Sequence, residues 1–200
     1  MLAERFRCPW CLGDPVYRAY HDREWGRPLK NSQKLFEFLI LDGAQAGLSW
    51  LTILKRREGY RAAFDGFEPG LMARYGDKDI ARLMGDSRII RNRRKIESAI
   101  GNARAYLSMM EGRVSFGKWL WDWVDGEPKI NHFKTLAEIP ASTALSGGIS
   151  RELRGRGFSF VGPTIIYAFI QAAGLVNDHL LDCFRHPEYQ DMREEGHGSC

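Results

Sequence analysis

The sequence predicts an all-α fold. Apolar residues recur at the spacing of amphipathic helices along most of the 200 residues, and the sustained alternation of apolar and polar residues that is typical of strands is absent. The chain is 44% hydrophobic and 12% aromatic, which is enough to bury a substantial core. We therefore expect one domain over residues 1–187 and a mobile tail over residues 188–200.

Five helices are expected in the first half of the chain, because capping residues and prolines interrupt the apolar pattern there. They begin at Pro15, after Asn31–Ser32, at Trp50, at Pro69 and after Asp77. Asp14 caps the first, with proline at its first helical position. The third, capped by Ser49, is predicted to run unbroken to about Phe64, and the fifth is predicted to end at Met84.

The second half predicts a long helix and a pair of helices joined by a turn. The longest helix is expected from about Asn92 to Met110, and a short helix with three tryptophans from Ser115 to Val124. Residues 135–138 have the sequence of a capping box. Two helices, Thr143–Arg154 and Pro163–Ala173, are then joined by the glycine-containing segment Gly155–Gly162.

From the hydropathy pattern we expect a soluble protein inside the cell. No apolar run is long enough to cross a bilayer, and the N-terminus lacks the apolar core of a secretion signal. The net charge of +4 is compatible with a nucleic-acid partner without proving one. Basic residues cluster at 88–95 and 151–156, where they are either solvated surface or contacts to phosphate.

Two cysteines and two histidines near the chain ends offer the ligands that zinc prefers. They are Cys8, His21, His179 and Cys183. The i, i+4 spacing of the last two places them on one face of a helical turn. A closed set of four protein ligands would serve structure, because it leaves no position for substrate. Spacing alone leaves other interpretations open: each residue could pack in the core, and Cys8 could pair with Cys11 as a Cys-x2-Cys half-site.

The turn between the last two helices has two competing interpretations. Gly157 and Gly162 can adopt backbone angles closed to other residues and allow close approach of a ligand. Pro163 then begins a helix whose first N–H groups and positive dipole end can bind a phosphate, as a helix-hairpin-helix element does. The alternative is a tight helical hairpin with an ordinary glycine cap.

Aromatic and acidic residues concentrate in three blocks, at 17–26, 41–50 and 174–179. Aromatic rings with one carboxylate can form a slot that stacks a flat, electron-poor ring and binds its edge. The alternative is that these aromatic residues simply belong to the core.

These blocks resemble the 3-methyladenine DNA glycosylase I family, and the resemblance covers nearly the whole chain. The matching stretches are Tyr-His-Asp-x-Glu-Trp-Gly at 20–26, Gln-Ala-Gly-Leu-Ser-Trp at 45–50, Ile-Ile-Arg-Asn-Arg-x-Lys-Ile at 89–96, Gly-Asn-Ala-Arg-Ala-Tyr at 101–106, Arg-Gly-Phe-x-Phe-Val-Gly at 156–162 and Gly-Leu-Val-Asn-Asp-His at 174–179. Several motifs in the right order are highly specific. The resemblance implies a helix-hairpin-helix DNA glycosylase, with the hairpin element at about 143–173.

The resemblance also implies a role for individual residues. One structural Zn²⁺ joins the segments 8–21 and 179–183, and its ligands are Cys8, His21, His179 and Cys183 but not Cys11. The damaged base stacks on Trp50, with Tyr17 and Tyr20 lining the pocket and Trp25 nearby. The DNA contacts come from the turn Gly47–Leu48, where Leu48 fills the gap left by the extruded nucleotide, and from the hairpin, with Gly157, Phe160, Gly162 and Thr164.

One position departs from the family. Asp42 stands where the family has a glutamate that binds the base edge, so the catalytic carboxylate is one methylene shorter. The expected activity is hydrolysis of the N-glycosidic bond of 3-methyladenine in double-stranded DNA. The Asp42 substitution leaves a non-catalytic alkylated-DNA-binding homologue as the alternative, and the four metal ligands alone would fit a zinc hydrolase.

Three further expectations concern chemistry and context. The glycosylase is expected to be monofunctional, because the segment Phe158–Thr164 lacks the lysine of many lyases with this hairpin. The expected partner is double-stranded DNA that contains alkylated bases, bound by a monomer without contact to a membrane. The expected location is the bacterial cytoplasm, where the substrate is associated with the nucleoid.

Overall fold

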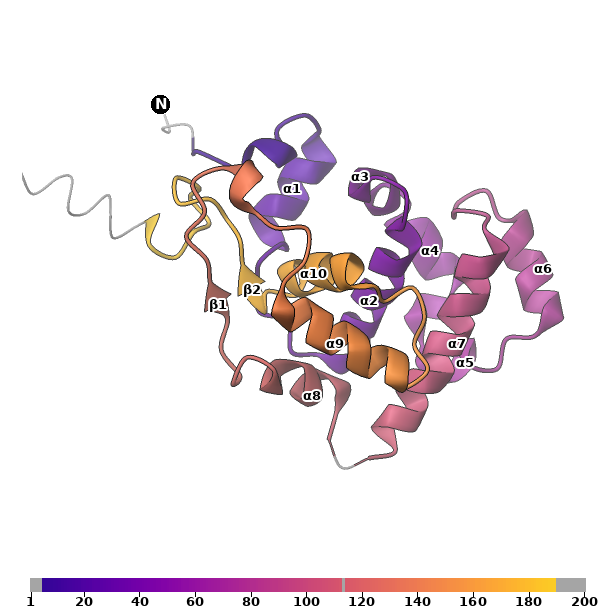
Figure 1. The fold of residues 1–200 in the computed structure, drawn as a ribbon. Coiled ribbons are helices and arrows are strands. Elements are labelled where there is room, and N and C mark those ends of the chain that lie inside the picture. Colours follow the sequence, from indigo (N-terminus) through magenta and orange to yellow (C-terminus); the bar gives the residue numbers. More distant parts are fainter. Residues whose placement is uncertain (1–4, 113, 190–200) are drawn as a thin grey trace, which may run out of the picture.

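The computed structural model describes residues 5–112 and 114–189, and its elements are nearly all helices (Figure 1). The α-helices are α1 (Pro15–Arg23), α2 (Ser32–Gln45), α3 (Trp50–Leu54), α4 (Arg57–Ala63), α5 (Pro69–Met72), α6 (Asp77–Gly85), α7 (Arg93–Met110), α8 (Phe116–Asp122), α9 (Ala144–Gly155) and α10 (Pro163–Ala172). Short 3₁₀ turns are η1 (Pro9–Cys11), η2 (Asp65–Phe67) and η3 (Leu136–Glu138). The prediction of an all-α fold is therefore confirmed, apart from one short strand pair.

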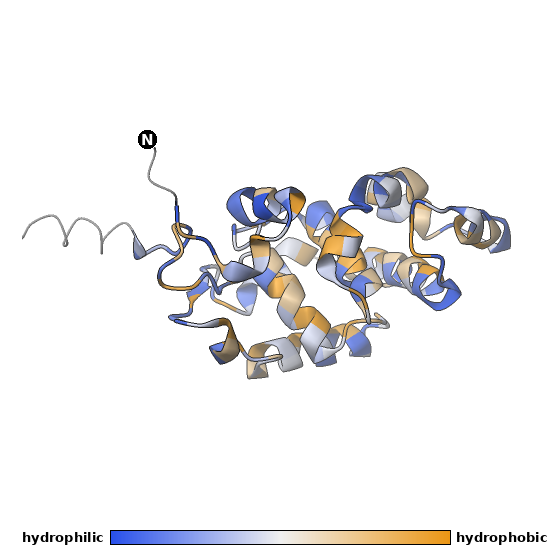
Figure 2. Ribbon diagram, turned by 90° about the horizontal axis from the view of Figure 1, so that it is seen from above, coloured by the Kyte–Doolittle hydropathy of each residue, from blue (hydrophilic) through white to orange (hydrophobic). Residues whose placement is uncertain are grey.

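Helix α2 lies at the centre of the fold because it is apolar on nearly all sides. Every residue from Leu35 to Ala44 except Glu37 is buried, and Asp42 is the one charged group among the buried ones. Helices α3, α7, α8 and α10 pack around α2, and α9 packs on α10. Figure 2 shows the hydrophobic colouring on the inner helices and the hydrophilic colouring toward the outer ones. The core thus surrounds the helix that carries the acidic candidate.

Most of the predicted helix starts are confirmed. At most of these starts a side-chain oxygen accepts a hydrogen bond from a backbone N–H of the first turn, which satisfies a group that the helix leaves unpaired. The capping residues that do so are Asp14, Asn31, Ser49, Asn92, Ser115 and Thr143. These are short-range contacts between neighbours in the sequence, so the local pattern was sufficient to predict them.

The prediction of one unbroken helix from Trp50 to Phe64 is wrong. It breaks into α3 and α4 at Lys55–Arg56, where Arg56 has φ −103° and ψ 0°. The Arg56 guanidinium donates a hydrogen bond of 2.7 Å to the carbonyl of Ser87. Gly59 lies so close to Arg88 that a Cβ would be 2.8 Å from the Arg88 carbonyl oxygen. Contact with this distant segment therefore sets the bend.

Two predicted caps are also wrong. Helix α6 begins after Gly76, whose N–H donates to the Asp79 carboxylate, so Asp77 is the first helical residue and not the cap. The sequence at 135–138 forms the 3₁₀ turn η3 without a capping box. Glu138 there accepts hydrogen bonds from the Lys134 N–H and the Thr135 hydroxyl.

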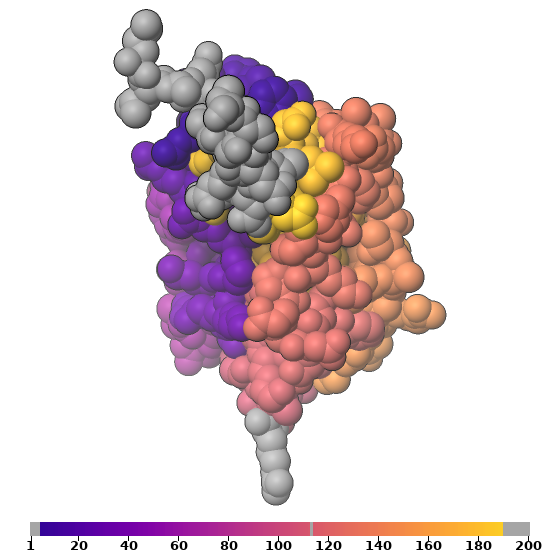
Figure 3. Space-filling model, turned by 90° about the vertical axis from the view of Figure 1, so that its left-hand side faces the viewer, coloured from indigo at the N-terminus to yellow at the C-terminus, as the bar shows by residue number. Residues whose placement is uncertain are grey.

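The N- and C-terminal segments of the described chain meet on one side of the molecule. Strands β1 (Lys129–Ile130) and β2 (Val176–Asn177) form a parallel pair. The backbone N–H of Phe184 donates to the carbonyl of Phe6 at 3.0 Å. Figure 3 shows the C-terminal segment, in yellow, between N-terminal residues and the loop before α9. From residue 190 on, the predicted tail lies outside the described residues.

None of the helices in the described part of the chain is both long and apolar enough to span a membrane.

Candidate functional site: an aromatic cavity beside a buried cysteine–histidine cluster

A cavity of about 230 Å³ lies between α1, α2, α3 and α10. It is lined by Trp10, Tyr17, Tyr20, Trp25, Asp42, Gln45, Trp50, Ile139, Ala168, Gln171 and Ala172. All five residues predicted from the sequence as base-binding or catalytic are in this lining. The volume is small for a ligand site, which favours a single flat ring system over a larger molecule.

The wall of the cavity is built from aromatic rings held edge to face. The centroid of the Trp10 ring lies 4.9 Å from that of Tyr17 and 5.1 Å from that of Trp25, both in T-shaped arrangements. The rings of Tyr20 and Trp50 lie 5.6 Å apart and are tilted by 52°. Aromatic rings in such contacts hold each other in place, so the wall is preformed.

Asp42 and Trp50 each present an unpartnered polar atom in this lining. Only 3% of Asp42 is exposed, and its Oδ2 has no hydrogen-bond partner among the described residues. The same holds for the indole Nε1 of Trp50. Burial raises the pKa of Asp42 well above its ordinary value, because a charged carboxylate loses its hydration there. An unpaired buried polar group costs stability, which indicates a function for it.

Gln171 lines the cavity with a fixed orientation, which sequence reasoning missed. Its amide nitrogen donates to the Asp178 carboxylate at 2.7 Å. Tyr167 and Asn131 donate to the same carboxylate at 2.6 and 2.7 Å. Since a carboxylate only accepts, the amide nitrogen of Gln171 must face Asp178, and the side-chain Oε1 of Gln171 stays free to accept from a ligand. In the sequence, Gln171 is the one amide in the otherwise largely apolar helix α10, and this could have indicated a functional role.

Trp10 and Gln45 were also missed as cavity residues. Gln45 belongs to the motif at 45–50, which could have drawn attention to it. Trp10 lies two residues after Cys8, and nothing in the local pattern indicates that η1 brings it against α1.

The four predicted metal ligands come together in one buried cluster. The ligand atoms of Cys8, His21, His179 and Cys183 all lie within 4.8 Å of one another. The Cys183 Sγ is 3.3 Å from the His21 Nε2 and 3.5 Å from the His179 Nδ1, and the Cys8 Sγ is 3.7 Å from the same Nδ1. Two sulfur and two imidazole donors could hold a metal ion.

Two details of this cluster differ from the prediction or refine it. His179 and Cys183 lie in an irregular turn and not on a helix, because the chain here packs against η1 and α1. Cys11 is buried but stays out of the cluster, with its thiol donating to the Cys8 carbonyl at 3.2 Å. The Cys-x2-Cys half-site is therefore not formed.

Polar groups around the cluster orient the imidazole rings. The Nδ1 of His21 lies 2.9 Å from the Asp22 carboxylate, which Arg7 pairs with in turn. The Nε2 of His179 lies 3.2 Å from the carbonyl of Trp25. Such second partners fix the tautomer that presents the other nitrogen to a metal. A hydrogen bond from Cys8 lowers the pKa of the Cys183 thiol, so one thiolate is already favoured.

Trp25 connects the cluster to the cavity. Its ring lies 4.6 Å from the ring of His179 and 6.4 Å from that of His21, and it also lines the cavity. Gly26, which follows, has φ +73°, and a Cβ there would lie 2.9 Å from the His179 Nε2. Only glycine permits this approach. The cluster therefore holds one wall of the cavity.

The residues predicted to contact DNA lie on two turns. Leu48 is 39% exposed and follows Gly47, whose φ is +75°. In the turn between α9 and α10, Gly157 has φ +89° and is exposed. Thr164, the second residue of α10, is also exposed. Gly162 was expected to need a special backbone angle, but its φ is −62°.

Phe160 takes the left-handed conformation in that turn, with φ +54°. Gly162 then serves as the N-terminal cap of α10, and Pro163 follows at the first helical position as predicted. Without a hydrogen bond from a capping side chain, the first N–H groups of α10 remain available to an anion.

Comparisons with known proteins identify the family of this chain. The family described as methyladenine glycosylase matches residues 10–186. The DNA-3-methyladenine glycosylase 1 of Escherichia coli (strain K12) is 51% identical over 181 residues, which cover 90% of this chain and 97% of that protein.

Two solved structures have the same fold. A crystal structure of 3-methyladenine DNA glycosylase I has a TM-score of 0.89 at 50% identity, covering 91% of this chain and all of that one. A variant of 3-methyladenine DNA glycosylase I in complex with 3-methyladenine has a TM-score of 0.87 at 40% identity, covering 90% of this chain and 97% of that one. Because the family match extends over most of the sequence, this chain belongs to the methyladenine glycosylase family.

Proposed function

We propose that this protein is a DNA-3-methyladenine glycosylase of base-excision repair. It hydrolyses the N-glycosidic bond of 3-methyladenine in alkylated double-stranded DNA and leaves an abasic site. The observation that carries the proposal is the aromatic cavity in which Asp42 and Trp50 keep buried polar atoms without partners. The relatives named for this activity, one of them in complex with 3-methyladenine, support it.

The substrate itself makes the reaction easy. Methylation at N3 puts positive charge on adenine and weakens its bond to C1′ of the deoxyribose. The C1′–N9 bond breaks, the bonding electrons neutralise the base, a water oxygen bonds to C1′ and one proton is released. The enzyme needs to extrude the nucleotide, bind the cationic ring and admit water to the sugar. Extrusion costs a few kcal/mol and costs less for a damaged base.

The cavity binds the cationic base in preference to a neutral one. The base stacks on Trp50, with Tyr17 and Tyr20 lining the pocket and Trp25 nearby. A cation on an aromatic face is favoured by about 0.5–2 kcal/mol. Asp42 accepts a hydrogen bond from the amino edge, and the positive base favours its ionised form. The free side-chain Oε1 of Gln171 offers a second acceptor. No strong general base is required.

The DNA duplex is held by the two exposed turns. The element from about 143 to 173 acts as a helix-hairpin-helix, in which Gly157, Phe160, Gly162 and Thr164 bring the backbone and the positive end of α10 to a phosphate. Leu48 enters the gap left by the extruded nucleotide, as apolar wedges do in other proteins that distort DNA.

The metal that the cluster fits is a structural Zn²⁺. Cys8, His21, His179 and Cys183 supply four ligands of the kinds that zinc prefers, and a four-ligand site leaves no position for substrate. A bound zinc would cross-link the chain ends and fix Trp25 at the cavity wall. The catalytic steps are carried by the other residues, so the zinc-hydrolase alternative has no support in this donor set.

The organisation that we propose is a monomeric glycosylase domain over residues 1–187, acting on nucleoid DNA in the bacterial cytoplasm. The bacterial source of the relatives supports the location.

The direct test is a base-release assay. Methylated duplex DNA is incubated with the protein, and the freed bases are separated by chromatography. Free 3-methyladenine in the supernatant is the expected result. Binding to methylated DNA without release would instead identify the non-catalytic homologue.

A further inference from the structure

Two of the sequence motifs, at 89–96 and 101–106, take no part in the cavity. The first motif leads into α7 and the second lies within it, and they contain Lys95 and Asn102, both on this helix. With Ser98, these residues occupy positions i, i+3 and i+7 of the helix, so all three lie on one face. Ser98 and Asn102 are buried polar residues. Lys95 binds the segment before the Leu48 turn, and Ser98 and Asn102 bind the hairpin turn. These are the two turns to which we assign DNA contact.

Lys95 holds the turn that carries Leu48. Its Nζ donates hydrogen bonds of 2.7 Å to the carbonyl of Ala44 and 2.6 Å to the carbonyl of Ala46. These carbonyls belong to the end of α2, where the negative end of the helix dipole also attracts a cation. Burial lowers the pKa of Lys95, which reflects the hydration given up for these contacts. The direction in which α2 ends, and hence the position of Leu48, depends on this ammonium group.

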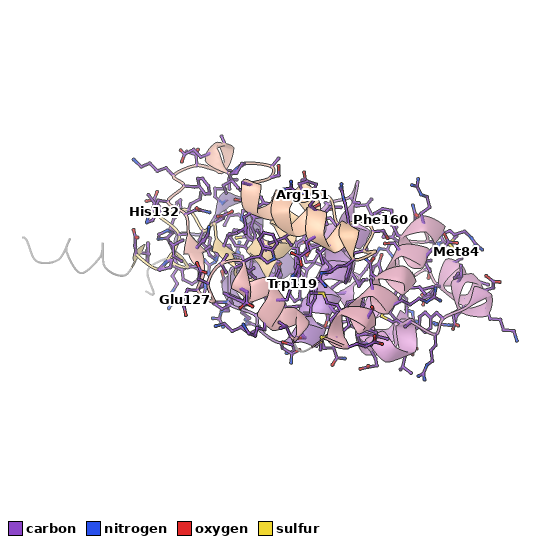
Figure 4. The ribbon with its side chains drawn as sticks, turned by 60° about the horizontal axis from the view of Figure 1, so that its bottom comes forward. Met84, Trp119, Glu127, His132, Arg151 and Phe160 are labelled. Atoms are coloured by element: carbon purple, nitrogen blue, oxygen red, sulfur yellow. The ribbon has the colours of Figure 1, made fainter. Side chains whose placement is uncertain are left out.

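Ser98 and Asn102 hold the hairpin turn. The Asn102 amide pairs with both backbone groups of Ser159: its Nδ2 donates to the carbonyl at 3.0 Å, and its Oδ1 accepts from the N–H at 2.8 Å. The Ser98 hydroxyl donates to the same carbonyl at 3.3 Å and accepts from the Ser159 hydroxyl at 2.8 Å. Phe160, labelled at this turn in Figure 4, is thereby kept in its left-handed conformation.

Helix α2 also approaches the hairpin turn at this face of α7. A Cβ on Gly43 would lie 3.5 Å from the Cβ and the carbonyl oxygen of Phe160. Lys95, Ser98 and Asn102 share with Gly43 and Phe160 the lining of a cavity of only about 10 Å³. That space is too small for a ligand, so the junction joins protein segments and binds nothing.

We propose that Lys95 is a positioning residue for nucleotide extrusion. One face of α7 fixes the Leu48 turn and the hairpin at a set separation, so that the duplex gripped by the hairpin meets Leu48 at the damaged nucleotide. The proposal rests on the proposed glycosylase function. Lys95 acts through Leu48 and does not touch the base, because it is absent from the lining of the aromatic cavity.

The first experiment separates extrusion from base binding. Lys95→Met keeps the aliphatic stem and removes both hydrogen bonds. We expect single-turnover release of 3-methyladenine from methylated duplex DNA to fall about tenfold or more, because small misplacements are costly in a positioned reaction. The affinity for the free base 3-methyladenine, measured by quenching of tryptophan fluorescence, should stay within about twofold, since distant sites act independently.

Two matched variants control for charge and for folding. Lys78→Met removes one positive charge from an exposed position on α6 and should release the base at the wild-type rate. Lys95→Arg keeps a cation that can reach two carbonyls and should restore most of the lost rate. Loss of free-base affinity in Lys95→Met, in parallel with the loss of release, would mean that the residue acts on the whole fold, and would overturn the proposal.

A double-mutant cycle tests whether Lys95 acts on base release through Leu48. If Lys95 acts through Leu48, adding Lys95→Met to Leu48→Ala should change the rate by less than about twofold. Independent, multiplying losses would overturn the proposal, as would wild-type release by Lys95→Met. If the wild-type protein releases no base, the proposed glycosylase function is wrong. If the wild type releases the base and Lys95→Met releases it equally fast, only the positioning role of Lys95 is wrong.

Discussion

Asp42 and Trp50 line one cavity, and each keeps a buried polar atom, Oδ2 and Nε1, without a hydrogen-bond partner within residues 5–112 and 114–189. A buried acceptor and a buried donor without partners cost stability, which indicates a function for these two residues. The first prediction concerns the acceptor. Asp42→Asn should reduce the release of 3-methyladenine by about tenfold or more, because the charge that favours the cationic base is lost.

Two comparisons sharpen this prediction. Binding of Asp42→Asn to undamaged duplex DNA, measured by fluorescence anisotropy, should match that of the wild type, since the DNA-contact turns are elsewhere. Asp42→Glu keeps the carboxylate and should keep most of the activity. An unchanged release rate in Asp42→Asn would remove this residue from the reaction.

The second prediction concerns stability and pH. Because burial raises the pKa of Asp42 in the folded protein, the unfolded chain loses its proton first as pH rises. The contribution of Asp42 to stability is therefore fully present below about pH 4, the ordinary pKa of aspartate, and is lost as pH rises toward the folded value. In urea unfolding at several pH values, the free energy of unfolding of Asp42→Asn should rise relative to that of the wild type as pH increases. Parallel curves across that range would contradict a raised pKa.

The third prediction concerns the metal cluster. The purified protein should contain one zinc ion per chain, and Cys8→Ser should lose it, because three ligands bind zinc more weakly than four. Cys11→Ser is the matched control, since Cys11 is equally buried but lies outside the cluster. Metal content is measured by elemental analysis. Equal zinc loss in both variants, or retention in both, would contradict the assignment of ligands.

Removal of the metal should also disturb the wall of the aromatic cavity. The ring of Trp25 packs on both histidines of the cluster and lines the cavity. Chelation should therefore lower the melting temperature and weaken the binding of free 3-methyladenine together, and added zinc should restore both.

The fourth prediction concerns the aromatic wall. Trp50→Leu should weaken the binding of free 3-methyladenine by about fivefold or more, because stacking adds about 0.5–1.5 kcal/mol beyond the burial of area. Trp123→Leu removes a tryptophan that does not line the cavity and serves as the control. Fluorescence titration measures both. Equal affinities in the two variants would place the base elsewhere.

The fifth prediction concerns the reaction type. A lyase needs an amine nucleophile, and no lysine lines the cavity. Lys95, on α7, is engaged with two carbonyls at the end of α2. Treatment of the protein and methylated DNA with borohydride should therefore trap no covalent adduct, whereas a bifunctional glycosylase in a parallel reaction should give one. An adduct would show that the enzyme is not monofunctional.

The sequence by itself determined most of the helices and the identity of the chemical groups. Caps such as Asp14 and Asn92 bind N–H groups two or three residues away, so their effect is readable from neighbours. The aromatic blocks, the carboxylate of Asp42 and the four metal ligands could be identified because their residue types and the family motifs specify the chemistry.

Only the tertiary structure decided how these groups meet. Cys8 and Cys183 are separated by most of the chain, and packing of its two ends brings them together. The bend at Arg56 and the irregular turn of His179 each follow from contact with a distant segment. The orientation of Gln171 depends on Asp178 in the same way. These contacts are non-local, and a local sequence pattern carries no information about which distant groups will share a cavity once the core has formed.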